Sequence, residues 1–390
     1  MFKYLLYVYI TFLSIQISAQ SRKFYNSGTA ELQKPVESLQ LNYLNDLPFL
    51  EVIINDKKYN FLFDTGAPTV ISSAIFKELG LKYAFESEVG DSQKSVRKQT
   101  FTMVPEISIG NVDFKNIGAV VIDFTEPEFK CLRMDGIIGS NQMALLFWKI
   151  NYLENSMLVS KDLKLLNNNG SFLKIPFKAS KQKLPVINSK IIKKNISIEI
   201  DTGFNGKLQI NKGEFNVPQN VAKEQYLVTK GINSVSLYGP APEKIEYIFK
   251  LNKLTLANQE FENQVLETGS LNLVGNQFLK NYEFILDWKT NTLHLKPIIQ
   301  PETTLKSFGF SYRFINNKAV ISLIFRDKNI PLEMNDEIVS INDISLDNLH
   351  TEDSCKYYLN TIEKELSKIT IRIRRGNEIK VFDLEKISYF

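Results

Sequence analysis

The stretch FLFDTGAPTVIS, residues 61–72, contains the tripeptide Asp64-Thr65-Gly66 between two apolar runs. A second stretch, IEIDTGFNGKLQI, residues 198–210, contains the same tripeptide as Asp201-Thr202-Gly203. In both copies a strand-like run leads into a carboxylate, a hydroxyl and a residue without a side chain, and a second apolar run follows. The pattern predicts a carboxylate held at a fixed turn, twice in one chain.

The repeat extends well beyond the tripeptides. A Leu-Pro pair, Leu47-Pro48 or Leu184-Pro185, precedes each aspartate by the same distance. Two aliphatic residues and a glycine follow each aspartate, as Ile137-Ile138-Gly139 and Leu273-Val274-Gly275, at offsets that differ by a single residue. A match sustained over this length indicates a duplicated unit. The chain therefore carries two copies of one mostly β unit.

Length and composition allow a large folded protein. The chain has 390 residues, enough for two or three domains that each have a core. Hydrophobic residues make up 44% and aromatic residues 12%, so the supply of apolar surface does not limit folding. The formal net charge is only +4, with acids and bases interspersed. This balance argues against nucleic acid as a partner.

The N-terminus has the features of a cleaved secretory signal. Lys3 provides a basic start, an apolar stretch runs from about Tyr4 to Ile17, and the small residues Ser18 and Ala19 follow. The apolar stretch is shorter than the roughly 20 residues that span a bilayer. We therefore favour a signal peptide over residues 1–19 rather than a membrane anchor, and expect an exported protein, periplasmic or secreted, without a stable membrane span.

Cysteine and histidine are scarce. Cys131 and Cys355 lie far apart in the sequence, and we favour two separate buried thiols, although export would also permit a disulfide. The two histidines, His294 and His350, lack the spacing of metal ligands. We therefore expect no metal and no cofactor, and a nucleophile activated by histidine is disfavoured.

Turn signals divide the first unit, residues 20–160. Asn55-Asp56 predicts the turn of a hairpin, and a short helix is expected to end at Gly80. The polar stretch 88–102 is either a mobile hairpin over a cleft or an ordinary surface loop. A polar break over residues 161–171 then marks the end of this unit.

The second unit, residues 171–296, repeats the same plan. It has a candidate hairpin of its own near residues 237–240. A linker around Pro297 and Pro301 follows it. The fold class predicted for the chain is thus mainly β.

Two such carboxylates have a chemical use if a pseudo-twofold axis brings Asp64 and Asp201 together. At close range both cannot comfortably ionise, so the pair would share one proton and titrate as a unit. One member can then act as base toward a water while the other donates a proton to a carbonyl oxygen. Hydroxyls beside the pair would bond across the axis, and glycines would allow close backbone approach. The residues expected to support the dyad in this way are Thr65, Gly66, Thr202 and Gly203.

The doubled tripeptide with its paired aliphatic-glycine segments resembles the aspartic peptidases, specifically retropepsin-like units fused in tandem into a pepsin-like bilobal chain. The resemblance covers roughly residues 40–296, and residues 275–288 are especially similar to the C-terminal lobe. It implies a catalytic dyad of Asp64 and Asp201 in a cleft between two pseudo-twofold-related β-barrel lobes, and cleavage of extended peptides. In that family an aliphatic-glycine strand threads past each catalytic loop, which would place here Ile137, Ile138, Gly139, Leu273, Val274 and Gly275.

The chain departs from this family at the residue after each tripeptide. Ala67 and Phe204 stand where pepsin-like lobes usually have Ser or Thr, whose hydroxyl bonds the carboxylate. Without that donor the charged form is less favoured and the dyad titrates higher. We therefore predict activity nearer mild acidity or neutrality than strong acid. The first hairpin also lacks the tyrosine of pepsin-like flaps around residues 90–94, and Phe204 narrows the cleft, so both features reduce the expected cleavage efficiency.

The last unit, residues 305–388, has another pattern of strands and one main helix, expected over residues 351–366. This order resembles a PDZ domain with its usual small helix shortened to about residues 330–334. The resemblance implies a β-sandwich whose groove receives a peptide C-terminus as an added strand. Its carboxylate-binding loop would include Phe308, Gly309 and Phe310. The alternative is a unit that only packs against the other two.

These inferences together predict an exported, monomeric aspartic endopeptidase that acts on a peptide or protein substrate. A protein that binds peptides in the same groove without hydrolysing them is the main alternative. A homodimer, in which each unit pairs with its like in another chain, is disfavoured because one chain supplies both halves.

Overall fold

The computed structural model describes residues 7–8, 24–167 and 171–390. Strands hold 52% of the residues and helices 11%, which confirms the mainly β fold class. The predicted signal peptide lies outside the described residues, except for the two residues of β1 (Tyr7–Val8).

The first repeat, within residues 20–160, is built from hairpins. The turn at Asn55-Asp56 has positive φ at both residues, as predicted. The predicted short helix forms after Ser72, whose side chain accepts a hydrogen bond from the Ile75 N–H, and it ends before Gly80. Its elements are β2 (Thr29–Leu32), β3 (Val36–Gln40), β4 (Asn42–Leu44), β5 (Leu47–Ile54), β6 (Lys57–Asp64), β7 (Val70–Ile71), α2 (Ser73–Glu78), β8 (Tyr83–Gly90), β9 (Val96–Ile109), β10 (Val112–Val121), α3 (Pro127–Cys131), β11 (Gly136–Gly139), α4 (Ser140–Met143), β12 (Phe147–Asn151) and β13 (Ser156–Ser160).

The second repeat, within residues 161–297, has the same pairing scheme. In the first repeat β11 runs parallel to β6 and antiparallel to β7, and in the second β24 runs parallel to β17 and antiparallel to β18. Its elements are α5 (Leu163–Leu166), β14 (Leu173–Pro176), β15 (Lys178–Ala179), β16 (Pro185–Ile191), β17 (Lys194–Ile200), β18 (Leu208–Asn211), α6 (Val217–Asn220), η1 (Lys223–Gln225), β19 (Tyr226–Gly231), β20 (Ser234–Ser236), β21 (Gly239–Pro240), β22 (Lys244–Leu256), β23 (Gln259–Gly269), β24 (Leu273–Val274), α7 (Asn276–Leu279), β25 (Tyr282–Asp287) and β26 (Thr292–Pro297).

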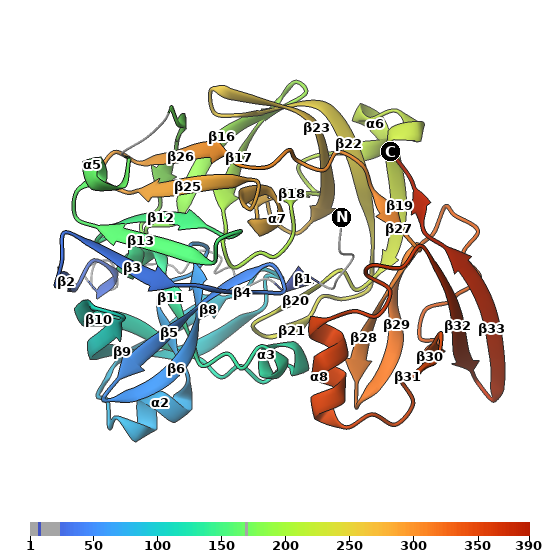
Figure 1. Cartoon of the computed structure of the whole chain (residues 1–390), viewed down its shortest axis with the longest axis horizontal. Helices are drawn as coiled ribbons and strands as arrows, with labels where there is room; N and C mark the ends of the chain where they lie inside the picture. Colours follow the sequence, from blue (N-terminus) through green and yellow to red (C-terminus); the bar gives the residue numbers. More distant parts are fainter. Residues whose placement is uncertain (1–6, 9–23, 168–170) are drawn as a thin grey trace.

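One six-stranded sheet joins the two repeats (Figure 1). Its order is β14-β26-β25-β12-β13-β3, and the central antiparallel pair is β12 of the first repeat with β25 of the second. Trp148 from β12 and Phe284 from β25 are both buried in a core cluster that extends through both repeats. This shared core fixes the two repeats relative to each other.

The C-terminal unit differs from the sequence prediction in its helices. The main helix ends at Leu359 rather than residue 366, because the backbone leaves helical geometry at Asn360. Residues 330–334 follow an irregular path instead of a short helix, since the Glu333 N–H and the Arg375 guanidinium both bond the Asp336 carboxylate. The unit contains β27 (Lys306–Ser307), β28 (Phe310–Ile315), β29 (Lys318–Phe325), β30 (Glu337–Ile341), β31 (Ile344–Ser345), α8 (Thr351–Leu359), β32 (Lys368–Arg375), β33 (Glu378–Glu385) and β34 (Ile387–Ser388).

Cys131 and Cys355 form a disulfide, so the expectation of two separate thiols is wrong. Helix α3 of the first repeat packs against α8 of the C-terminal unit, which brings the two Cα atoms to 4.9 Å (Figure 1). A buried ion pair, Arg313 of β28 with Glu128 of α3 at 2.9 Å, joins the same two units. The sequence separation of the cysteines hid this contact, because only the fold places the two helices together.

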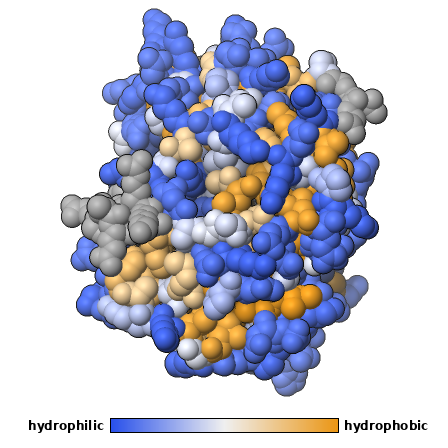
Figure 2. Space-filling model, turned by 90° about the vertical axis from the view of Figure 1, so that its left-hand side faces the viewer, coloured by the Kyte–Doolittle hydropathy of each residue, from blue (hydrophilic) through white to orange (hydrophobic). Residues whose placement is uncertain are grey.

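Hydrophobic side chains form patches between hydrophilic ones on the end of the molecule shown in Figure 2. Apolar atoms contribute more than half of an ordinary protein surface, so such patches alone indicate no partner. Among the described residues, every helix is too short or too polar to cross a bilayer.

Candidate active site

Each tripeptide lies where a strand ends in a turn. Asp64 is the last residue of β6, and Asp201 directly follows β17. Both carboxyls are fully buried. Along the strands that lead to them, successive side chains point alternately into the core and to the face that carries the aspartates, as the pleat of a strand requires.

The aliphatic-glycine segments run beside these strands. In β11 Ile137 and Ile138 pair in parallel with β6, and in β24 Leu273 and Val274 pair in parallel with β17. The glycines that end them lie very close to the tripeptide loops. A Cβ on Gly139 would lie 2.0 Å from the Pro68 carbonyl carbon, and one on Gly275 would lie 2.5 Å from the Gly206 oxygen. Any side chain there would displace a loop.

The two loops contact each other directly. A Cβ on Gly203 would lie 2.3 Å from Cγ of Asp64, so the Asp64 carboxyl rests against the second loop. Within each loop, Oδ1 of the aspartate accepts a hydrogen bond from the glycine N–H two residues on. The Gly66 bond to Asp64 is 2.7 Å and the Gly203 bond to Asp201 is 2.8 Å. These glycines therefore fix the carboxyl orientation.

The two threonines form a reciprocal network across the pseudo-twofold axis. The Thr65 N–H donates to Oγ1 of Thr202 at 2.9 Å, and the Thr202 N–H donates to Oγ1 of Thr65 at 3.0 Å. Each hydroxyl then donates to a backbone oxygen of the opposite repeat, Thr65 to Ile200 at 2.6 Å and Thr202 to Phe63 at 2.8 Å. All four bonds are buried, so they hold the loops in one relative position.

Both aspartates have raised pKa values. Burial raises the pKa of Asp64 well above its ordinary value, and the charge of Asp201 raises it further. Burial also raises the pKa of Asp201, to about 7, against the opposing hydrogen bond from the Gly203 N–H. Oδ2 of each aspartate is buried and has no hydrogen-bond partner in the described part of the chain. This agrees with the absence of a hydroxyl at Ala67 and Phe204.

A third carboxyl, overlooked in the sequence analysis, accompanies the pair. Glu199 lies two residues before Asp201, and strand alternation places both side chains on the same face of β17. Burial raises the pKa of Glu199 well above its ordinary value, and the Asp201 charge adds to the effect. The available signal was the acidic residue two positions before Asp201 in IEIDTG, a spacing that puts both side chains on one face of a strand. The corresponding residue of the first repeat is the apolar Leu62, so the comparison of the two repeats did not reveal it.

Two hairpins meet above this region. Asp91, at the tip of the β8–β9 hairpin, accepts hydrogen bonds through Oδ2 from the Ser236 hydroxyl at 2.5 Å and the Tyr238 N–H at 3.3 Å. The Tyr238 hydroxyl donates to the Val89 oxygen at 3.1 Å. Val89 and the tip residue Leu237 are buried in the cluster that contains Ala67 of the first loop. Both hairpins predicted from the sequence thus form. The first hairpin lacks a tyrosine at its tip, whereas the second contains Tyr238.

The proposed carboxylate loop of the C-terminal unit is separate from the aspartates. Gly309 has φ +85°, and a Cβ there would lie 2.6 Å from the Ile330 side chain. Its N–H donates to the Ser307 hydroxyl at 2.9 Å. Phe308 and Phe310 are both buried in the core of this unit. The loop is therefore formed, with the Gly309 donor already bonded to a neighbouring side chain.

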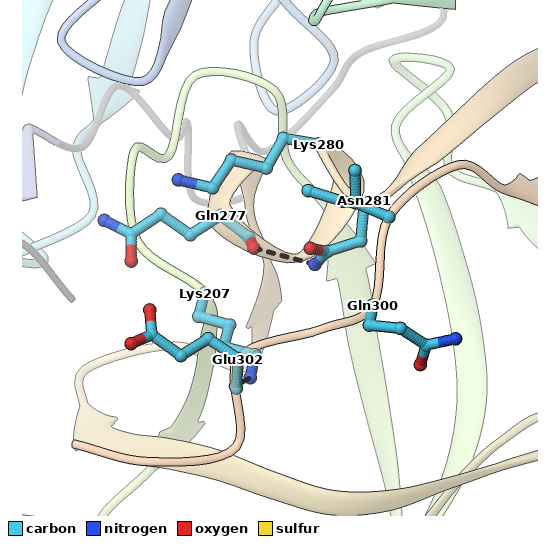
Figure 3. A pocket seen from close by; sticks show the side chains of 7 residues that line it. Lys207, Gln277, Lys280, Asn281, Gln300 and Glu302 are labelled. Carbon is cyan, nitrogen blue, oxygen red and sulfur yellow. Dashed lines mark hydrogen bonds between the residues drawn. The ribbon is translucent and has the colours of Figure 1, made fainter. Parts of the chain in front are cut away.

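A pocket of about 240 Å³ lies behind the second loop (Figure 3). Lys207 of this pocket is buried, which lowers its pKa to about 8. Its Nζ donates to the backbone oxygen of Glu302 at 2.9 Å. Lys280, which follows α7, pairs with Asp46 of the first repeat at 3.2 Å. The Lys207 bond thus holds the linker to the C-terminal unit against the second repeat, and the Lys280 pair joins the two repeats. The pocket is lined by Lys207, Gln277, Lys280, Asn281, Ile299, Gln300 and Glu302.

A family model described as aspartyl protease matches residues 50–142, a segment that contains Asp64 and the first aliphatic-glycine strand. No curated protein matches the chain. The first repeat is thus similar to aspartyl proteases over this segment, and the match supports a protease-like function for the protein.

Proposed function

We propose that this protein is an aspartic endopeptidase with Asp64 and Asp201 as its catalytic dyad. The observation that carries the proposal is the contact of the buried Asp64 carboxyl with Gly203 of the second loop, where Thr65 and Thr202 bond the two loops reciprocally. The aspartyl protease match over the first repeat supports the same reaction class.

The reaction follows from one proton shared by the dyad. The ionised carboxyl takes a proton from a water, whose oxygen attacks the carbonyl carbon of the peptide bond, while the protonated carboxyl donates to the carbonyl oxygen. The resulting tetrahedral intermediate loses the amine as that nitrogen takes up a proton from the dyad. Burial around the carboxyls strengthens these electrostatic effects.

The two hairpins give this site a cover. The hairpins contact each other through Asp91, Ser236 and Tyr238, and we propose that an extended substrate enters when these contacts open. Such gating is common in enzymes that exclude water during the reaction.

We further propose that the protein is exported and acts as a monomer, because the N-terminal stretch reads as a signal peptide and one chain supplies both aspartates. We propose that the C-terminal unit is PDZ-like, on its order of strands and one main helix. Its disulfide and buried ion pair with the first repeat favour a packing role over substrate recruitment.

The decisive experiment is peptide cleavage by the exported form of the chain and by Asp64→Asn and Asp201→Asn variants. We expect each variant to lose activity at least about 10²-fold, because each removes one half of the acid–base pair. Asp56→Asn is a matched control, since Asp56 lies in an exposed turn of the same repeat. Turnover by Asp64→Asn equal to that of the unchanged chain would remove the dyad, and peptide binding without cleavage by the unchanged chain would favour a non-catalytic binding protein.

A further inference from the structure

At the position of Glu199 the two repeats differ in the residue itself and in the segment that covers its side chain. Along β17 the face that carries Asp201 goes from exposed at Ser197 to partly buried at Glu199. On the equivalent face of β6, Leu62 precedes Asp64 and is fully buried. A side chain two residues before either aspartate thus lies beside the dyad.

The covering differs because one connection is much shorter. In the first repeat residues 122–135, which include α3, connect β10 to β11, and Phe129 of α3 is buried in the same cluster as Leu62. In the second repeat only residues 270–272 connect β23 to β24. No counterpart of α3 therefore lies over Glu199 among the described residues, and its side chain stays partly exposed.

The surroundings of Glu199 suit a long side chain with a charged end. Its direct neighbours on the adjoining strands are Val186 on β16 and Leu273 on β24, both apolar. Leu273 packs in turn on Phe204. Oε1 of Glu199 is buried and has no hydrogen-bond partner in the described residues. Apolar neighbours beside an unsatisfied carboxyl match the methylene stem and cationic head of Lys or Arg.

We propose that Glu199 makes the second repeat select a cationic side chain, Lys or Arg, next to the scissile bond of the substrate. The assignment of this ligand as a substrate residue rests on the proposed function. The carboxyls of Asp64, Asp201 and Glu199 give the site acidic character, which favours a positive group over a neutral one. An arriving ammonium or guanidinium group stabilises ionised Glu199, which burial alone disfavours.

The test measures binding separately from cleavage. In an Asp64→Asn background, calorimetry gives the affinity for short alanine-rich peptides with a central pair of Phe and Lys, Phe and Gln, or Phe and Leu, in both orders. We expect the best lysine peptide to bind at least about tenfold more tightly than its leucine counterpart. Glu199→Gln should abolish this preference and Glu199→Leu should reverse it, whereas the exposed Glu262→Gln should leave it unchanged.

Equal affinities for the lysine and leucine peptides, or a lysine preference that persists in Glu199→Leu, would overturn the inference. Mapping of cut sites by mass spectrometry with Asp64 intact then tests the proposed function. Glu199-dependent binding of lysine peptides without any cut would sink the peptidase assignment and leave a cation-selective groove. Cleavage without enrichment of Lys or Arg beside the cut would support the peptidase assignment and overturn the cation selectivity inferred for Glu199.

Discussion

At the scale of single residues, the carboxyl oxygens Oδ2 of Asp64 and Asp201 distinguish this site. Neither atom has a hydrogen-bond partner in the described chain. A donor at this atom would favour the ionised form. We therefore predict that Ala67→Ser, which adds only a hydroxyl at a buried position, shifts the acidic limb of the pH–rate profile to lower pH by about one unit. The profile of the cleavage rate measures this shift, and Ala144→Ser, on the partly buried end of α4, is the control. An unchanged acidic limb would contradict a role of the missing hydroxyl.

The raised pKa of Asp64 also affects stability. In the folded chain the pKa of Asp64 lies well above its value in the unfolded chain. As pH rises past about 3.9, the unfolded chain ionises this group while the folded chain keeps it protonated, so folding becomes less favourable. Asparagine removes this penalty. We predict that Asp64→Asn unfolds at a higher temperature than the unchanged chain at about pH 7, and at a similar temperature at about pH 3. Calorimetry at both pH values checks this, and a lower unfolding temperature at about pH 7 would count against it.

Site residues that occur in both repeats could be predicted from the sequence, whereas a site residue that occurs in only one repeat was not identified. The reciprocal threonine bonds and the close approach of Gly203 to Asp64 follow from a tripeptide present twice. Glu199 has no acidic partner in the first repeat, so the comparison of repeats gave no reason to select it. Its importance appears only when the short connection before β24 is seen to leave it partly uncovered.

At the scale of elements, the two hairpins contact each other through the Asp91 carboxylate, and we propose that this contact opens for substrate. The Ser236 hydroxyl bonds the Asp91 carboxylate, which also accepts the backbone N–H groups of Gln93 and Ser95 in its own turn. Ser236→Ala removes one of the bonds between the hairpins, together with the bond from the same hydroxyl to the Gly239 backbone oxygen, and leaves the Tyr238 bonds in place. A hydrogen bond to a charged group contributes about 1.5–3 kcal/mol, so its loss should raise the open population more than tenfold.

We therefore predict faster amide hydrogen exchange in residues 234–240 of Ser236→Ala, with an unchanged unfolding temperature for the rest of the chain. Mass spectrometry of exchanged peptides measures this directly. Ser87→Ala, on β8 of the opposite hairpin, is a matched control. Equal exchange in the two variants would mean that the Asp91 contact does not hold the hairpins together.

Element prediction succeeded where local residues dictate the geometry. The turn at Asn55-Asp56 and the end of α2 before Gly80 depend on residues that accept positive φ. The irregular path of residues 330–334 depends on contacts with a distant strand. Arg375 of β32 bonds both the Asp336 carboxylate and the Pro331 backbone oxygen, and a local pattern does not contain that information.

At the scale of the whole molecule, the C-terminal unit is joined to both repeats. The disulfide between Cys131 and Cys355 joins it to the first repeat. Strand β29 extends the sheet of the second repeat by pairing with β19, the strand that leads into the β20–β21 hairpin (Figure 1). The unit thus links β19, the strand before the β20–β21 hairpin, to the first repeat. This link gives the unit a structural role that does not require peptide binding.

Gly231 is the residue on which the joint between β19 and β29 depends. It has φ +143°, and a Cβ there would lie 2.1 Å from the Ser322 oxygen of β29. We predict that Gly231→Ala separates β29 from β19, so that reduction of the disulfide then releases the C-terminal unit and makes residues 298–304 sensitive to added protease. Gly376→Ala is the matched control, because Gly376 also has positive φ but open space around its Cβ position, and it should cost only the backbone strain of about 1–2 kcal/mol. Limited proteolysis of both variants, oxidised and reduced, decides the matter. If reduced Gly231→Ala resists cleavage as well as reduced Gly376→Ala, the shared sheet does not hold the unit in place, and the buried pair of Arg313 with Glu128 must suffice.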